Sequence, residues 1–179
     1  MGQADGYTDL YRQYLPRILN YVRMRVEGEA LAQDLTAEVF ERAVSRQHTL
    51  RRPEAFGAWL FRIAHNVVAG HYRKRRPSVS LDRAGDLVAP ELSPPEVVIR
   101  QEELARMREA LATLSEREQE IIRLRFAGGL GNQEVAKVLR LRPGHVAVLL
   151  YRALRKLRAQ LEQDSLLGEA QQEASRGDS

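Results

Sequence analysis

Residues 132–158 read NQEVAKVLRLRPGHVAVLLYRALRKLR and contain two stretches of helical periodicity separated by a short turn. In the first stretch Val135, Ala136 and Leu139 fall on one face of an amphipathic helix. Pro143 marks the turn, after which apolar periodicity resumes in a longer helix. A short helix, a brief turn and a longer helix predict a helix-turn-helix, whose second helix can enter a DNA major groove about 12 Å wide.

Cations surround the second helix of this unit. Arginine and lysine at such density suit neutralisation of a DNA backbone. The alternative is an ordinary helical hairpin whose basic face is only solvated. The cations are Arg140, Arg142, Arg152, Arg155, Lys156 and Arg158.

The rest of the chain also shows helical periodicity. No stretch alternates with period two for long enough to form a strand. Pro16 lies inside the first helical pattern, so that helix is expected to kink or split there. Ser115 and Glu118 have the spacing of a capping box, which opens a further helix. The expected helices are 7–25, 28–46, 55–75, 95–113, 116–126, 132–139 and 143–162.

Turn-forming residues divide the chain into two lobes. Proline, serine, glycine and aspartate cluster between 77 and 95, which predicts a flexible linker. Residues 163–179 are polar and rich in small side chains, and we expect a disordered tail there. The sequence therefore predicts an all-α fold of two small helical domains, 1–76 and 96–162, the second of which contains the helix-turn-helix.

The charges follow the same division. Residues 1–76 and 97–162 each hold 13 basic and 8 acidic residues, whereas 77–96 and 163–179 each hold one basic and four acidic residues. Two basic lobes separated by an acidic strip suggest a bipartite grip on one long anion. Chance segregation of solvated charge is the alternative.

The residue types that most enzymes need are missing or scattered. Cysteine is absent, which removes disulfide frameworks and thiol nucleophiles. The four histidines are scattered, and no metalloprotease, phosphate-loop or serine-hydrolase motif occurs. No apolar run is close to the length of about 20 residues that a membrane-spanning helix needs. We expect a cytoplasmic, non-catalytic protein with no metal site, cofactor or small-molecule substrate.

A second nucleic-acid signal lies in the first lobe. Aromatic and amide side chains from Trp59 to Asn66 precede a run of cations that ends at Arg76. Such a helix can follow a phosphate backbone while it offers stacking faces and hydrogen-bond donors to unpaired bases. The alternative places the aromatic rings in the core and lets the cations only favour a helix C-terminus.

Three segments resemble bacterial sigma factors of the extracytoplasmic-function (ECF) group, in the order that this family shows. Residues 34–43 resemble the segment that docks on the clamp helices of the largest polymerase subunit. Residues 59–66 resemble the promoter-melting segment, and 114–158 the second DNA-binding domain. The likeness extends over about residues 6–162.

The resemblance implies a transcription initiation factor that binds core RNA polymerase and directs it to promoters. The first domain would hold the minus-ten element and take a flipped base into a pocket formed by the loop 46–54. The second domain would read the minus-thirty-five element, and the acidic linker would thread toward the RNA path of the polymerase. The implied partners are core RNA polymerase, promoter DNA and an anti-sigma protein that masks both lobes.

The same resemblance assigns roles to individual residues. Polymerase docking falls to Asp34, Leu35, Glu38, Phe40 and Arg42. Contacts with the minus-ten element fall to Gln47, His48, Arg51, Arg52, Asn66, His71, Arg73, Lys74, Arg75 and Arg76. Contacts with the minus-thirty-five element fall to Arg140, Arg142, His145, Ala147, Val148, Arg152, Arg155 and Lys156.

The second helix of the helix-turn-helix departs from the family pattern. Many relatives carry Lys or Arg, Ser and Arg where this chain has Ala147, Val148 and Leu149. Three interpretations follow: thymine methyls and groove shape replace hydrogen bonds, upstream specificity is weak, or another protein covers the apolar face. We favour weak upstream specificity, with phosphate contacts supplying the affinity.

Two other functions stay open at this point. A helix-turn-helix regulator that acts alone accounts for the second lobe, but not for the docking and melting segments. A helical adaptor that binds no nucleic acid requires both basic lobes to be coincidental.

Overall fold

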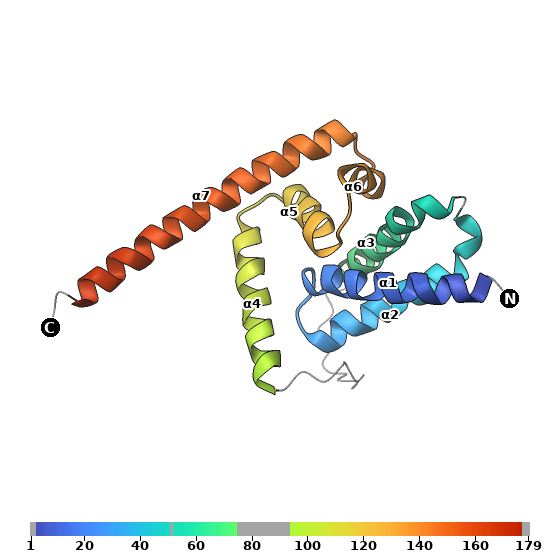
Figure 1. Ribbon diagram of the computed structural model, residues 1–179, viewed down its shortest axis with the longest axis horizontal. Helices are drawn as coiled ribbons and strands as arrows, with labels where there is room; N and C mark the ends of the chain where they lie inside the picture. The colour runs from blue at the N-terminus through green and yellow to red at the C-terminus, as the bar shows by residue number, and fades with distance from the viewer. Residues whose placement is uncertain (1–2, 51, 75–93, 177–179) are drawn as a thin grey trace.

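The computed structural model describes residues 3–50, 52–74 and 94–176, and none of these residues forms a strand (Figure 1). The prediction of an all-α fold is confirmed. Among these residues, no helix has both the length and the apolar character needed to cross a membrane. In chain order the elements are α1 (Gln3–Arg23), α2 (Glu29–Ser45), the turns η1 (Gln47–Thr49) and η2 (Pro53–Ala55), α3 (Phe56–Lys74), α4 (Pro94–Ala112), α5 (Glu116–Ile122), the π-helical turn η3 (Arg123–Ala127), α6 (Asn132–Leu139) and α7 (Pro143–Arg176).

Helices α1, α2 and α3 form the N-terminal lobe, residues 3–74. Helix α2 packs against both α1 and α3. The side chains that meet between them are apolar and fully buried, among them Ile18, Val22, Val39, Leu60 and Val68. Their helical spacing in the sequence places them on one face of each helix, so burial of that face holds the lobe together.

Helix α1 passes through Pro16 without a break, so of the two expected outcomes, a kink or a split, the split does not occur. Proline removes one helical hydrogen bond and crowds the preceding turn. Tertiary contacts fix the helix on both sides of it. The Tyr14 ring lies 5.2 Å from the ring of Phe56, and Ile18 is completely buried.

The C-terminal lobe, residues 94–176, contains the predicted helix-turn-helix. Helix α6 spans the predicted residues, and α7 begins at the predicted Pro143. Helix α7 packs against α5 and α6 through Val146 and Ala153, both completely buried. Arg140, in the turn, has a left-handed backbone with φ of 55°, which places its side chain outside the helix that precedes it.

Helix α7 continues to Arg176, so the prediction of a disordered tail from residue 163 is wrong for the residues up to 176. The segment 163–176 is rich in glutamine, leucine, alanine and glutamate, which have high helix propensity. The helix is already nucleated at Pro143, and each added residue then contributes a hydrogen bond. Extension of a formed helix therefore outweighs the small polar residues on which the prediction was based.

The two lobes share one apolar core. Helix α3 packs against α6, and α1 packs against η3. Phe61 of α3 lies so close to Gly128 that a Cβ on Gly128 would come within 2.8 Å of its ring. Arg17 donates to the Gly128 and Gly129 carbonyl oxygens at 2.9 and 3.0 Å. The sequence predicts two domains but carries no signal for this close packing between them.

The capping box of α5 is present and extends to α7. The Ser115 backbone N–H donates to a Glu118 carboxylate oxygen at 3.0 Å. The Lys156 ammonium lies 2.9 and 2.8 Å from the two oxygens of the same carboxylate. The hydrogen bond from Lys156, together with those from Ser115, lowers the pKa of Glu118 to about 2.

We predict that the free energy of unfolding contains an acid-sensitive contribution from Glu118. Its pKa in the folded protein lies below the ordinary value of 4.5, so protonation favours the unfolded chain. The contribution is complete above about pH 5 and is lost as the pH falls toward about 2. Urea unfolding at a series of pH values should show a flatter dependence for Glu118→Gln than for the wild type.

Glu116→Gln is the matched control, because Glu116 is an exposed acid on the same helix. This variant should retain the wild-type pH dependence. Identical slopes for the wild type and Glu118→Gln would contradict the prediction.

Candidate nucleic-acid interface

The first turns of α7 present an exposed face that is apolar in its centre. Val146 and Ala153 point inward, whereas Ala147, Val148 and Tyr151 are exposed, Val148 by 48% and Tyr151 by 63%. Sequence reasoning missed Tyr151. The feature of the sequence that could have identified Tyr151 is its spacing from Val148 and Ala147, because residues three and four apart share one face of a helix.

Four arginines flank this face. Arg140 and Arg142 precede α7, and Arg152 and Arg155 lie in α7 about one and two turns after Ala147. All four side chains are exposed. The Arg155 guanidinium lies 5.9 Å from the Tyr151 ring centre. His145 is exposed beside them. Cations on both sides of an exposed helix face are suited to two phosphate strands that border one groove.

Lys156 was also predicted to contact DNA, and the structure gives its ammonium a partner within the protein. It is bound to Glu118, which ties α7 to the start of α5. A phosphate that took this ammonium would leave the buried Glu118 carboxylate with fewer donors. The geometry therefore favours a fastening role for Lys156 over a DNA contact.

The loop between α2 and α3 borders a cavity of about 330 Å³, which we call the loop cavity. Trp59 forms one wall, and its indole N–H donates to the Thr49 hydroxyl at 3.0 Å. Arg52 lies at the edge, and Lys137 of α6 forms part of the lining. Gln47 and His48 are exposed on the same loop, and Arg51 lies outside the described residues.

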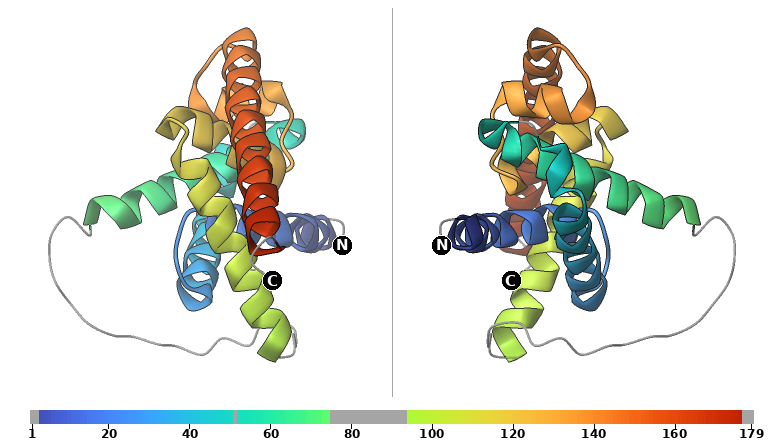
Figure 2. Two further views of the ribbon diagram at one scale, coloured as in Figure 1. Left: turned by 90° about the vertical axis from the view of Figure 1, so that its left-hand side faces the viewer. Right: turned by 90° about the vertical axis from the view of Figure 1, so that its right-hand side faces the viewer.

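The remaining predicted minus-ten residues follow α3 away from the loop cavity. Asn66 is exposed and shares a smaller hollow with Arg62 and Arg140. His71 is half-buried, whereas Arg73 and Lys74 are exposed at the end of α3, which projects from the body of the molecule (Figure 2). Arg75 and Arg76 lie outside the described residues.

Helix α2 divides the predicted docking residues between its two faces. Leu35 is 5% exposed and Phe40 is 9% exposed, so neither is free to dock on another protein, which corrects the prediction. They belong to the buried stripe of α2, and the Phe40 ring lies 4.5 Å from that of Tyr11. Asp34 is exposed, and Glu38 forms an ion pair with Arg42 on the outer face.

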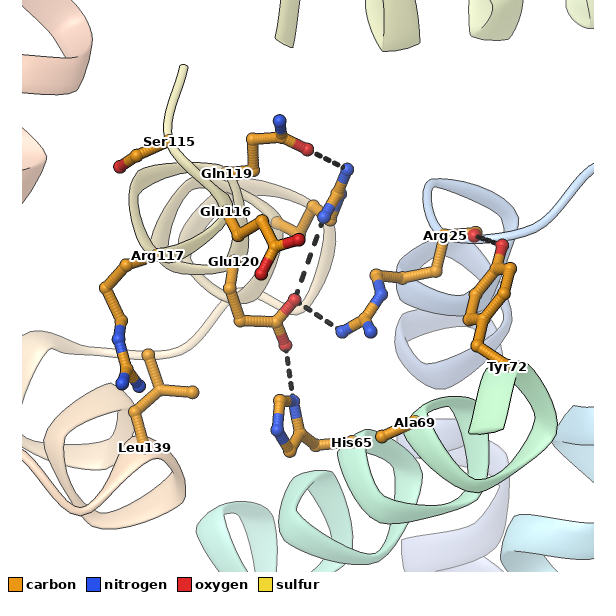
Figure 3. A pocket seen from close by; sticks show the side chains of 11 residues that line it. Arg25, His65, Ala69, Tyr72, Ser115, Glu116, Arg117, Gln119, Glu120 and Leu139 are labelled. Atoms are coloured by element: carbon orange, nitrogen blue, oxygen red, sulfur yellow. Dashed lines mark hydrogen bonds and ion pairs between the residues drawn. The ribbon is translucent and has the colours of Figure 1, made fainter. Parts of the chain in front are cut away.

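A buried carboxylate joins the two lobes (Figure 3). Glu120 of α5 accepts hydrogen bonds from the Tyr21 hydroxyl at 2.6 Å and from Arg25 at 2.5 Å, and its third partner is His65 Nδ1 at 2.8 Å. These three partners belong to the N-terminal lobe, while Arg123 of η3 lies 3.8 Å away. We call these five residues the Glu120 cluster.

Burial and charge act in opposite directions within this cluster. Burial raises the pKa of Glu120, but the hydrogen bond with His65 and the charge of Arg25 outweigh it, so the pKa lies below its ordinary value. Burial and the neighbouring Glu120 charge raise the pKa of Tyr21. Sequence reasoning missed the cluster. The feature of the sequence that could have revealed it is the position of Glu120, four residues before Leu124. Helical spacing assigns this position to the core, where a carboxylate needs partners.

Two family models match this chain, one in each lobe. The model described as sigma-70 region 2 matches residues 10–77, and that described as sigma-70, region 4 matches residues 104–157. The chain belongs to the sigma-70 family. The region 2 match contains α2, the loop cavity and α3, and the region 4 match contains the helix-turn-helix.

Named relatives place this sigma-70 chain in the ECF group, as the resemblance implied. It is 37% identical to the ECF RNA polymerase sigma factor BldN of Streptomyces coelicolor, over 92% of this chain and 63% of BldN. It is 34% identical to the ECF RNA polymerase sigma factor ShbA of Streptomyces griseus, over 90% of this chain and 91% of ShbA.

Solved sigma factors share the fold. CnrH, in a complex with the cytosolic domain of CnrY, superposes with a TM-score of 0.68 and 26% identity, over 91% of this chain and 92% of CnrH. RpoE of Bartonella quintana, in a complex with the anti-sigma factor NepR, gives a TM-score of 0.66 and 22% identity, over 88% of this chain and 97% of RpoE.

Proposed function

We propose that this ECF chain is a transcription initiation factor that binds core RNA polymerase and directs it to specific promoters. It acts in the cytoplasm and performs no catalysis of its own. The observation that carries the proposal is the pairing of two surfaces on one chain. An exposed recognition helix flanked by arginines lies in the region 4 match, and an aromatic-walled cavity lies in the region 2 match.

The loop cavity is the proposed site for a base of the minus-ten element. Extrusion of a base from the duplex costs a few kcal/mol, which stacking and hydrogen bonds in a pocket can offset. Trp59 offers an aromatic wall, and Arg52 offers a cation to the phosphate beside the flipped base. Asn66, Arg73 and Lys74 continue the polar surface along α3.

Polymerase docking is assigned to the outer face of α2. Asp34 and Glu38 lie four residues apart, so both carboxylates project from the same side of the helix. Carboxylates in this arrangement can accept charge-assisted hydrogen bonds from arginines of a partner. The buried Leu35 and Phe40 act indirectly, because they hold α2 against the rest of the N-terminal lobe.

An anti-sigma protein is the proposed regulator. A groove of about 650 Å³ between α1, α4, η3 and α7 is lined mainly by apolar side chains, including Met107 and Phe126, which are 54% and 63% exposed. Arg23, Arg106 and Arg123 lie among the lining residues. An amphipathic helix with acidic flanks matches both the apolar floor and these cations.

The direct test is runoff transcription with purified core polymerase, with and without this protein, on a library of genomic fragments. The proposal expects new start sites that share one upstream and one downstream element. No added start site would contradict it. Specific binding to duplex DNA in the absence of polymerase, without any new transcript, would favour a helix-turn-helix regulator that acts alone.

We predict that Asp34→Asn combined with Glu38→Gln weakens binding to core polymerase about tenfold, because two charge-assisted hydrogen bonds are lost. Fluorescence anisotropy of the labelled protein with core polymerase measures the affinity. Glu27→Gln removes an exposed acid that lies before α2 and should leave the affinity unchanged. Equal affinities of the double variant and the wild type would exclude this face of α2 from docking.

A further inference from the structure

The outward face of the recognition helix limits what it can read in DNA. Ala147 and Val148 have no side-chain donor or acceptor, and Tyr151 offers one hydroxyl at the end of a ring that is 63% exposed. The next turn of the same face continues with Leu154, which is 42% exposed. Hydrogen bonds to base edges are therefore scarce in the middle of this face.

The flanking arginines determine where this apolar face lies on DNA. Arg140 and Arg142 on one side and Arg152 and Arg155 on the other can each reach a phosphate strand. A helix held in this way between two strands lies in the major groove, with its central residues against the base edges. The apolar group that bases present there is the C5-methyl of thymine.

We infer that Ala147, Val148 and Tyr151 read the upstream promoter element through thymine methyl groups. The inference rests on the proposed function and deepens it. It replaces the weak upstream specificity that we favoured from the sequence. The structure places the three side chains together on the surface, where burial of each methyl against them strengthens binding about fourfold.

Deoxyuridine provides the test, because it lacks the methyl group but keeps the hydrogen-bonding edge of thymine. The reconstituted polymerase complex is bound to a promoter found by runoff transcription, with upstream thymines replaced by deoxyuridine on one strand at a time. We expect about a fourfold loss of affinity for each methyl that is read. In Val148→Thr, which keeps the shape but adds a hydroxyl, the loss should shrink at one position.

Val44→Thr is the matched control, since Val44 is an exposed valine on α2, far along the chain from the recognition helix. It should show the wild-type loss. Equal affinity for thymine and deoxyuridine promoters would overturn the inference, as would a loss that Val148→Thr and Tyr151→Ser leave unchanged. Failure of the proposed function is distinct, because no promoter-dependent transcript would then form on thymine DNA.

Discussion

A carboxylate that is buried away from water needs hydrogen-bond donors and positive charges beside it. The packing of the two lobes depends on how Glu120 meets this requirement. Its side chain is 7% exposed, and its partners come from α1, from the turn that follows α1, from α3 and from η3. Removing one partner of such a buried group is strongly destabilising, of the order of several kcal/mol. The position of α5 is therefore coupled to the correct packing of α1 and α3, although the two lobes are far apart in sequence.

Two carboxylates on the short helix α5 fix its orientation, each through a different set of partners. Glu118 is bound by Ser115 at the start of α5 and by Lys156 of α7, whereas Glu120 is bound by the N-terminal lobe. Helix α5 thus connects the recognition helix to the region 2 match through two separate ionic contacts. A change in the packing between the lobes changes the support of α5, and α7 rests on that same helix.

The sequence predicted the helices well and their arrangement poorly, for a physical reason. Apolar periodicity and caps are local, and they located α6, the start of α7 and the capping box of α5. Contacts between distant residues have no local signal, so Glu120 was not recognised as buried and Lys156 was assigned to DNA. The docking segment was found by resemblance, which does not tell a buried face from an exposed one, and Leu35 and Phe40 were misassigned in consequence.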